Sequence, residues 1–444
     1  MSGPSLDELL AVPRTALLVG MGVANRAVAG ALLRRGHRVV AIDDSPSADL
    51  RADADALGIA LESSDELARL CAEADLVVPT PGLPEHHAAF AAADAATTPV
   101  VSEFDLAAVW DDRPIVAVTG TNGKTTVVEL AVAALAAAGR SAVAAGNTDI
   151  PLVTAIDDPA TDVFVVEASS FRLARATRFR PTVATWLNFA PDHLDVHRDL
   201  ASYEAAKAHL FTLVGDGTIV ANADDPVVMR NVPAGGTVVT FGSTGDWHLD
   251  GDQLAGPDDA FTTAAELWRS LPHDIDNTLA VAASLAPLGV PAAAIARAAA
   301  TFAPLAHRVS PIGKIDGQTY YDDSKATTPH ATLSALRGFD EVVLIAGGRN
   351  KGIDLSPMAA AADRVAAVVA IGDAAEEIER AFTPGTPVVH ADDMDAAVAA
   401  ARAHSAGRVP VLLSPGCASF DWYRNYGERG DDFARAVAVV EEQP

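Results

Sequence analysis

Cysteine and aromatic residues are both scarce in this sequence. Only Cys71 and Cys417 occur among 444 residues, which excludes a framework of disulfides and makes a reducing, cytoplasmic compartment the simplest expectation. Aromatic residues make up 5% of the chain although 50% is hydrophobic, because alanine and valine dominate the apolar set. This composition favours close packing of helices on sheets over an aromatic-rich β-sandwich.

Basic residues are also few. The chain has 32 lysines and arginines against 59 aspartates and glutamates, which gives a net charge of -27. A chain this acidic should repel nucleic acid and anionic lipid, and its overall field cannot attract an anionic substrate. Any phosphate site must therefore be local, built from main-chain N–H groups, a few basic side chains and metal ions.

Long uninterrupted apolar runs are missing. Residues 277–296 carry no charge and are numerous enough to cross a membrane, but Pro287, Gly289 and Pro291 interrupt them. The pattern instead predicts two helices joined by a turn. Acidic residues stand near the start of the chain in place of a basic residue and an apolar block, so we expect no secretory signal.

What the sequence does contain is a repeated pattern of a short aliphatic strand, a glycine-bearing turn and an alanine-rich helical stretch. The strands of the three copies are residues 16–19, 115–118 and 342–346. Further short aliphatic strands are expected at residues 39–42, 76–78, 163–166, 183–187, 218–221, 367–371 and 411–413. Strands that alternate with helices predict parallel sheets with helices on both faces. The length allows roughly three domains, with boundaries near residues 102 and 305.

The second glycine turn carries the strongest chemical signal. Residues 115–126 read IVAVTGTNGKTT, an apolar strand that runs into a glycine-rich loop and a helix-compatible stretch. Main-chain N–H groups of such a loop point at phosphate oxygens; Lys124 would reach the β- and γ-phosphates and Thr125 would hold Mg²⁺. Only two residues separate Gly120 from Gly123, so the loop is a variant of the usual motif. An ordinary strand-to-helix turn is the alternative, but it does not explain the combination of glycines, lysine and threonines.

Polar residues also follow two neighbouring strands. Glu167 ends the strand at 163–166, where a carboxylate points into the crevice in which ligands bind; it is a candidate for Mg²⁺, with a solvated acid as the alternative. Lys207 lies in an expected helix, and its sequence context alone indicates a lysine on the surface. The loop after strand 183–187 offers side chains suited to metal ligation or proton transfer, namely Asp192, His193, Asp195 and His197.

The C-terminal third holds three further polar clusters. A strand end near residue 322, with a histidine and an arginine upstream, is followed by the glycine-flanked turn at 347–352 and by residues 413–426. Ser419 could begin a helix and bind an anion at its N-terminus, or simply cap that helix. The side chains singled out in these clusters are His307, Arg308, Asp322, Asp323, Lys325, Thr327, Lys351 and Ser419.

The N-terminal glycine turn has the outline of a dinucleotide fingerprint. Gly20-Met21-Gly22 follows a strand, and Asp43 and Asp44 follow the next one. Asn25 occupies the place of the third glycine, so the signal for bound NAD is weak. A nucleotide-like ligand at that edge is still the expectation.

Six motifs in order along the chain resemble those of the Mur ligases of peptidoglycan synthesis. They are GTNGKTT, EASSF, NFAPDHLD, DSKAT, GGRNKG and SPGCASFD, and the resemblance covers nearly the whole chain. It implies an α/β fold of three domains: a Rossmann-like N-terminal domain for a uridine-diphosphate substrate (1–102), a central P-loop mononucleotide-binding α/β domain for ATP (103–305) and a Rossmann-like C-terminal α/β domain for an amino acid (306–444). The DSKAT run is closest to the D-glutamate-adding branch.

The activity implied by the resemblance is ATP-dependent amide-bond formation through an acyl phosphate. ATP with Mg²⁺ would phosphorylate the carboxylate of UDP-N-acetylmuramoyl-L-alanine, and D-glutamate would attack it. The implied enzyme is cytoplasmic and monomeric, has small-molecule substrates only, and binds neither nucleic acid nor membrane.

The resemblance also implies roles for individual residues. The implied catalytic residues are Lys124, Glu167, His193 and Lys207; the metal would be held by Thr125, Glu167, His193 and a Lys207 carbamylated by CO₂. Nucleotide binding would use Gly120, Thr121, Asn122, Gly123, Lys124, Thr125, Thr126, Asn277, Arg308 and Asp323. The uridine-diphosphate substrate would contact Val23, Ala24, Asp43, Asp44, Ser45, Thr80, Gly82 and Asn147, and Ser169 is placed among the substrate-binding residues. D-Glutamate would contact Lys325, Thr327, Lys351, Ser419, Phe420 and Tyr426.

Some positions depart from the family pattern, and other functions stay open. Ser45, Asp274, Thr328 and Arg349 differ from what the family pattern leads us to expect, which affects details of substrate contacts. The nearest alternative is a related ligase that adds a different amino acid or extends folate with glutamate. A dinucleotide-dependent oxidoreductase would leave GTNGKTT unexplained, and a catalytically inactive nucleotide-binding regulator is disfavoured because the expected catalytic side chains are present.

Overall fold

The computed structural model describes residues 5–194, 196–303 and 305–441, and the chain divides into two units. The first unit comprises Met1–Phe189, Asp195–Thr263 and Thr278–Ala299, and the second comprises Ala190–Leu194, Ala264–Asn277 and Ala300–Pro444. Asp195, one of the candidate site residues, lies outside the described residues. Each unit is built on parallel sheet, as the sequence predicts.

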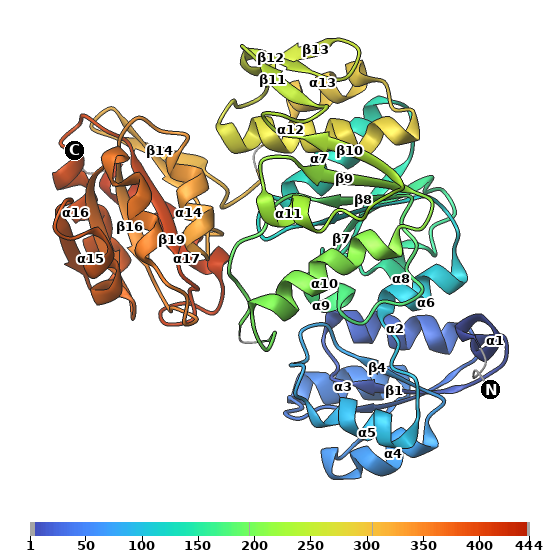
Figure 1. The fold of residues 1–444 in the computed structure, drawn as a ribbon. Helices are drawn as coiled ribbons and strands as arrows, with labels where there is room; N and C mark the ends of the chain where they lie inside the picture. The colour runs from blue at the N-terminus through green and yellow to red at the C-terminus, as the bar shows by residue number, and fades with distance from the viewer. Residues whose placement is uncertain (1–4, 195, 304, 442–444) are drawn as a thin grey trace. The chain divides into compact units, whose positions relative to one another are not determined.

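A four-stranded parallel sheet opens the first unit, in the order β3-β2-β1-β4. Its elements are α1 (Leu6–Leu10), β1 (Thr15–Val19), α2 (Val23–Arg34), β2 (Arg38–Ile42), α3 (Ala48–Leu57), β3 (Ala60–Glu62), η1 (Ser64–Glu66), α4 (Leu67–Glu73), β4 (Leu76–Pro79) and α5 (Ala88–Ala96). Alternate residues of β1 face opposite sides: Leu17 and Val19 join one buried cluster, and Ala16 and Leu18 join another. Helices α4 and α5 contribute to the first cluster and α2 to the second (Figure 1).

A six-stranded parallel sheet follows in the same unit, in the order β10-β9-β8-β5-β7-β6. Its elements are α6 (Glu103–Trp110), β5 (Ile115–Thr119), α7 (Lys124–Ala137), β6 (Ala142–Gly146), α8 (Leu152–Ala155), β7 (Val163–Glu167), α9 (Ser170–Leu173), β8 (Val183–Trp186), α10 (Leu200–Leu213), β9 (Thr218–Asn222), α11 (Pro226–Arg230) and β10 (Thr237–Phe241). One buried cluster extends from α2 through α6 and α8 to the strands of this sheet. The two sheets of the first unit therefore share a hydrophobic core.

A small antiparallel sheet of three strands was not predicted. It consists of β11 (His248–Asp250), β12 (Gln253–Ala255) and β13 (Ala260–Thr263), with Trp247 packed edge-on against Phe261. The segment after it contains η2 (Ala264–Glu266), α12 (Pro272–Leu285), η3 (Ala286–Leu288) and α13 (Ala292–Thr301). The prediction of two helices joined by a turn is thus confirmed. Among the described residues, no helix has the length and apolar character needed to cross a bilayer.

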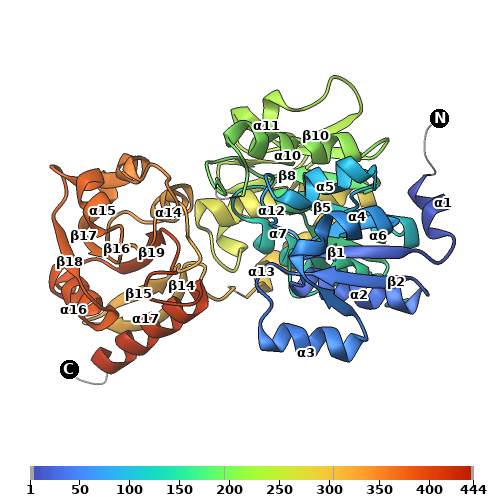
Figure 2. The ribbon, with the colours of Figure 1, turned by 90° about the horizontal axis from the view of Figure 1, so that it is seen from below.

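The second unit contains one six-stranded sheet in the order β14-β15-β19-β16-β17-β18. Its elements are β14 (Ser310–Ile315), β15 (Gln318–Asp322), α14 (Pro329–Leu336), β16 (Val342–Gly347), η4 (Ser356–Arg364), β17 (Val365–Ile371), α15 (Ala375–Phe382), β18 (Val388–Ala391), α16 (Met394–Ser405), β19 (Val411–Gly416) and α17 (Tyr426–Glu441). Only the edge strand β14 runs antiparallel to its neighbour. Figure 2 shows α16 and α17 on one side of the sheet and α14 and α15 on the other, which matches two separate buried clusters.

All ten strands predicted from aliphatic runs are present, with ends shifted by up to three residues. Two expectations about helices were wrong. The third glycine turn is followed by the 3₁₀ segment η4 and not by an α-helix, and no helix begins at Ser419, because α17 starts at Tyr426. The boundaries at residues 102 and 305 stay a prediction.

Candidate active site

The glycine loop between β5 and α7 has the backbone that its sequence demands. Gly120 and Gly123 have φ values of 155° and 86°, in the region that favours glycine. A Cβ on Gly120 would lie 3.0 Å from the Cβ of Leu187. The ammonium of Lys124 folds back over the loop and donates to the main-chain oxygens of Gly120 at 2.9 Å and Thr121 at 3.1 Å. The lysine is therefore held above the loop that the sequence predicts to bind phosphate.

Glu167 joins this loop to a neighbouring strand end. The Thr125 hydroxyl donates to Glu167 Oε2 at 2.8 Å, and Asn147 Nδ2 donates to Glu167 Oε1 at 3.0 Å. These contacts arise because β7 lies between β5 and β6, so the carboxyl ends of all three strands meet at one edge. A hydroxyl and a carboxylate oxygen side by side are ligands that suit Mg²⁺. Two residues expected to hold the metal are thus in direct contact, and Asn147, expected to contact the uridine-diphosphate substrate, binds the same carboxylate.

Lys207 is buried beneath the loop. Its sequence context alone indicated a surface lysine, and that interpretation was wrong. Its side chain is 1% exposed, its Nζ donates to the Gly120 oxygen at 2.8 Å, and it lies 4.6 Å from the centre of the Tyr203 ring. Helix α10 carries it there because Tyr203, Lys207 and Leu210 share the buried face. Burial of an ammonium ion is costly, so this position calls for a chemical reason beyond packing.

The N-terminal glycine turn is organised by two residues of the expected substrate site. A Cβ on Gly20 would come 2.6 Å from Thr80 Cγ2, and Asp43 Oδ2 accepts the Met21 N–H at 2.9 Å. Val23 is 61% exposed at the start of α2, whereas Asp44 pairs with His87 at 2.9 Å. The Ser45 N–H donates to Asp43 Oδ1 at 3.0 Å, so the departure at Ser45 leaves this turn intact.

A pocket of the first unit joins the segment after β4 to residues of α5, α6 and α9. It is lined by Pro79, Thr80, Pro81, Gly82, Leu83, Glu85, Phe90, Ser102, Glu103, Phe171, Arg172, Ala174, Arg175, Val196 and His197. Arg172 is buried and forms an ion pair with Glu103, and burial lowers the pKa of Arg172 to about 10. Arg172 and Arg175 are matched in this pocket by Glu85 and Glu103, so the lining carries no net formal charge. Thr80 and Gly82 were expected here, whereas the arginines were not singled out.

His197 links the two parts of this pocket. Its Nδ1 lies 3.1 Å from Glu85 Oε1, its Nε2 lies 2.9 Å from Ser170 Oγ, and its ring stacks on Phe171. It is 2% exposed, and both of its ring nitrogens lie within hydrogen-bond distance of protein oxygens. These contacts do not favour the metal ligation that the sequence offered for this residue. Ser169, expected to contact substrate, precedes Ser170 in the chain. It is buried, and its hydroxyl has no hydrogen-bond partner among the described residues.

In the second unit, the end of β15 is buried. Ser414 donates to Asp323 Oδ2 at 2.7 Å, and burial raises the pKa of Asp323 to about 7. Lys325 Nζ donates to the Tyr426 hydroxyl at 3.0 Å, which brings together two residues expected to bind the amino acid. The departure at Thr328 has a structural explanation, since its side chain caps α14.

Arg429 is a residue that the sequence analysis missed. It is 1% exposed and donates to Ser324 Oγ at 2.9 Å, to the Ser324 oxygen at 2.8 Å and to the Cys417 oxygen at 3.1 Å. Burial lowers its pKa to about 10. It lies within the helical stretch of α17, where no motif marks it, so only the tertiary structure reveals that it holds the DSKAT run in place.

Main-chain pairing brings Ser419 beside the turn around Lys351. Arg349 and Ala418 exchange two main-chain hydrogen bonds of 2.8 Å and 3.0 Å. The Tyr423 N–H then donates to the Ser419 oxygen at 2.9 Å, but this single turn does not continue into a helix. Ser419 is buried, Phe420 is 60% exposed, and Lys351 Nζ lies 3.8 Å from Asp192 Oδ1. The Arg349 guanidinium pairs with Asp373 at 3.2 Å.

The residues expected around the nucleotide base are partly engaged elsewhere. Asp274 is buried and pairs with Arg269 at 2.6 Å, and Arg269 also donates to the main-chain oxygen of Arg308 at 3.1 Å. The departure at Asp274 is therefore accommodated by an ion pair. Asn277 lies on α12, and His193 has a φ of 57° and lies 3.3 Å from Asp192.

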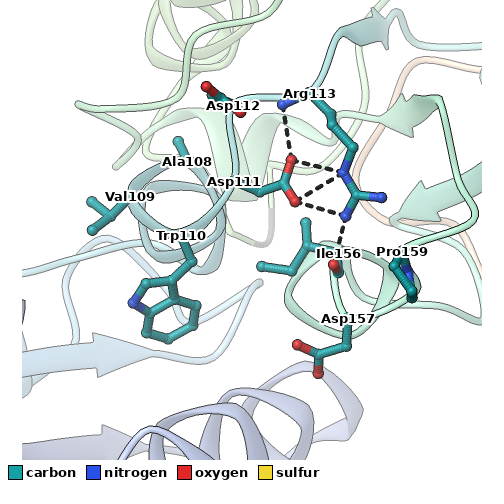
Figure 3. A pocket seen from close by; sticks show the side chains of 9 residues that line it. All are labelled: Ala108, Val109, Trp110, Asp111, Asp112, Arg113, Ile156, Asp157 and Pro159. Carbon is teal, nitrogen blue, oxygen red and sulfur yellow. Dashed lines mark hydrogen bonds and ion pairs between the residues drawn. The ribbon is translucent and has the colours of Figure 1, made fainter.

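A second cavity contains none of the expected site residues. It has a volume of about 590 Å³ and is lined by residues 108–113, 156, 157 and 159. Figure 3 shows the Arg113 guanidinium paired with both oxygens of Asp111. Arg113 also donates to the Ile156 oxygen at 2.6 Å. Its charge serves the scaffold of the first unit.

Sequence comparisons agree on one family. The Mur ligase middle domain matches residues 118–263, and the Mur ligase glutamate ligase domain matches residues 307–417. UDP-N-acetylmuramoylalanine--D-glutamate ligase of Frankia casuarinae is 41% identical over 96% of this chain and 94% of its own, and that of Syntrophotalea carbinolica is 36% identical over 96% and 97%. The fold is similar to that of MurF from Acinetobacter baumannii, with a TM-score of 0.62, 16% identity and coverage of 96% of this chain and 90% of that one.

Proposed function

The chain belongs to the Mur ligase family, and we propose that it is an ATP-dependent ligase that forms an amide bond between UDP-N-acetylmuramoyl-L-alanine and D-glutamate. The observation that carries the proposal is the cluster at the glycine loop. Lys124 lies over the loop, Lys207 lies beneath it, and Thr125 contacts Glu167 at 2.8 Å. In a chain of net charge -27, this cluster supplies the local charge and N–H groups that a triphosphate needs.

The reaction proceeds in two steps that balance. A carboxylate oxygen of the uridine-diphosphate substrate attacks the γ-phosphorus of ATP, and ADP leaves. The neutral amine of D-glutamate then attacks the acyl carbon, the nitrogen loses a proton, and phosphate leaves. A carboxylate has no adequate leaving group of its own, and phosphorylation provides one. Lys124 stabilises the negative charge on the phosphoryl group in transit.

The residues around Glu167 fit a magnesium ion. Thr125 and Glu167 offer hard oxygen ligands 2.8 Å apart, and the described residues contain no separate cluster of three or more His, Cys, Asp or Glu side chains that could hold a metal. We assign Mg²⁺ to Thr125 and Glu167, with His193 at a second ion. The metal supplies charge neutralisation for the phosphates.

Lys207 is assigned as a carbamate formed with CO₂. The conversion replaces a buried cation by an anion, which a nearby metal ion stabilises. The buried position of Nζ at 2.8 Å from Gly120 supports the assignment, because a free ammonium there is costly.

The two substrates other than ATP are assigned to separate regions. The uridine-diphosphate substrate is placed at the turn near Asp43 and the arginine-bearing pocket, with Val23, Ala24, Asp44, Ser45, Thr80, Gly82, Asn147 and Ser169 among its contacts. D-Glutamate is placed in the second unit at Lys325, Thr327, Lys351, Ser419, Phe420 and Tyr426. Residues 1–102, 103–305 and 306–444 are assigned as the three domains, and the enzyme as a cytoplasmic monomer that acts on small molecules.

An acceptor panel tests the proposal. The protein is incubated with ATP, Mg²⁺ and UDP-N-acetylmuramoyl-L-alanine, and ADP release is measured on addition of D-glutamate, L-glutamate, L-alanine or meso-diaminopimelate. We expect only D-glutamate to trigger release, with a product of the corresponding mass. Release with another amino acid would indicate a related ligase, and release with folate and glutamate a folylpolyglutamate-type enzyme.

A further inference from the structure

The side chain of Asn188 forms a bidentate contact with the centre of the glycine loop. Its Oδ1 accepts the N–H groups of Thr121 at 3.1 Å and Asn122 at 2.9 Å, and its Nδ2 donates to the Asn122 oxygen at 3.1 Å. The main-chain oxygen of Asn188 also accepts the Thr121 N–H at 3.1 Å. One residue just beyond the end of β8 therefore engages both residues between the two glycines.

The loop needs such a support because of its composition. Gly120 and Gly123 both adopt positive φ values, and glycine loses more conformational freedom on ordering than any other residue. Only Thr121 and Asn122 lie between them, so the loop is shorter than the usual phosphate-binding loop. Contacts to these two residues fix most of its backbone.

Asn188 is itself held firmly. The indole Nε1 of Trp186 donates to the Asn188 oxygen at 3.0 Å, and Asn222 Nδ2 donates to the neighbouring Leu187 oxygen at 2.8 Å. Leu187 also contacts the loop, since a Cβ on Gly120 would lie 3.0 Å from its Cβ. The support is thus part of the sheet edge and not a pendant side chain.

We propose that Asn188 is a positioning residue for the triphosphate: it holds the loop in its phosphate-binding conformation before ATP arrives. Because the Thr121 and Asn122 N–H groups donate to Asn188, the phosphates are gripped by the first turn of α7 and by Lys124. Preorganisation of this kind lowers the cost of binding. The inference rests on the proposed function, since it concerns the same ATP site.

The test compares Asn188→Ala and Asn188→Ser with Asn231→Ala, which removes asparagine hydrogen bonds to Glu204 and to the Val227 oxygen in the same unit. Asn188→Ala should raise the KM for ATP and the Kd for Mg-ADP about tenfold. The KM for D-glutamate and for the uridine-diphosphate substrate should stay unchanged, and the melting temperature should fall no further than in Asn231→Ala. Asn188→Ser keeps an acceptor oxygen and should give an intermediate KM for ATP; it decides the matter if the alanine variant does not fold.

Equal increases in all three KM values, or a Kd for Mg-ADP equal to that of Asn231→Ala, would overturn the inference. Mg-ADP binding by Lys124→Ala separates a failure of the role of Asn188 from a failure of the assignment of the loop. If Lys124→Ala loses Mg-ADP and Asn188→Ala binds it normally, only the role of Asn188 is refuted. If Lys124→Ala binds Mg-ADP normally, the assignment of the loop itself fails.

Discussion

The phosphate-loop region of the first unit and the amino-acid region of the second unit hold their polar residues in different ways. In the first, candidate residues contact one another or the same atom: Thr125 contacts Glu167, and Lys124 and Lys207 both donate to the Gly120 oxygen. In the second, residues around the candidate site are tied to buried supports, as in the contact of Asp323 with Ser414. Contacts among the candidate residues thus hold the first region, and buried residues outside the candidate set hold the second, so mutations should separate activity from stability.

The largest effect is expected at Lys124 in the phosphate-loop region. Lys124→Ala should lower kcat/KM about a thousandfold, because it removes an ammonium that stabilises the transferring phosphoryl group. The melting temperature should stay near that of the wild type, since Lys124 Nζ donates to main-chain oxygens of its own loop. ADP release and thermal unfolding measure the two quantities, with exposed Lys314 replaced by alanine as the control. Near-normal turnover would contradict the prediction.

At Arg429, a buried support of the second unit, we expect a loss of stability. Arg429→Met should reduce the free energy of unfolding by about 3 kcal/mol, because Ser324 and the Cys417 oxygen lose charged hydrogen-bond donors in a buried setting. Chemical denaturation gives this value, and Arg435→Met, at an exposed ion pair on the same helix, serves as the control. A stable Arg429 variant that lost only activity would contradict the division between the two regions.

Lys207 tests whether a buried cation in the first region acts through a carbamate. Lys207→Ala should lose activity about a hundredfold, as expected for a residue that tunes a metal site, and a small added carboxylate should restore part of it. The same carboxylate should not rescue Lys124→Ala, which has lost a positive charge. Rescue of both variants, or of neither, would count against the carbamate.

Asp323 makes stability in the second unit depend on pH. Its pKa is raised from 3.8 to about 7, so the folded protein retains a proton that the unfolded chain releases above about pH 4. The stabilising contribution is therefore complete below pH 4 and is lost as pH rises to about 7, with a total change of about 4 kcal/mol, of which about 2.5 kcal/mol falls between pH 5 and pH 8. In Asp323→Asn, the free energies of unfolding at pH 5 and pH 8 should lie closer together than in the wild type. If the free energy of unfolding of that variant depended on pH as in the wild type, the assignment of the effect to Asp323 would be refuted.

The smallest effect is expected at Lys351. Lys351→Ala should raise the KM for D-glutamate about tenfold and leave the KM for ATP unchanged, because one charge-assisted contact to one substrate is lost. Steady-state kinetics with each substrate varied in turn provides the measurement, again with Lys314→Ala as control. Equal weakening of ATP and D-glutamate would move the turn at 347–352 from the amino-acid site to a nucleotide or hinge element.

What the sequence could predict depends on whether the contacts are local in the chain. Aliphatic runs and glycine turns locate the strands and the phosphate loop, because both depend on residues adjacent in the chain. The contact of Thr125 with Glu167 could be anticipated, since parallel strand ends meet at one edge. The burial of Lys207 and the roles of Asn188 and Arg429 could not, because they depend on contacts with residues 66 to 105 positions away. The pairing of Ala418 with Arg349, which brings Ser419 beside the turn at 347–352, is likewise long-range.

Isotope transfer tests the central claim that ATP activates a carboxylate through an acyl phosphate. The protein is supplied with ATP, D-glutamate and UDP-N-acetylmuramoyl-L-alanine that carries ¹⁸O in its terminal carboxylate. One ¹⁸O atom should appear in inorganic phosphate for each amide bond formed, because the carboxylate oxygen that attacks the γ-phosphorus leaves with it. Phosphate without the label, or the label in AMP, would contradict the account.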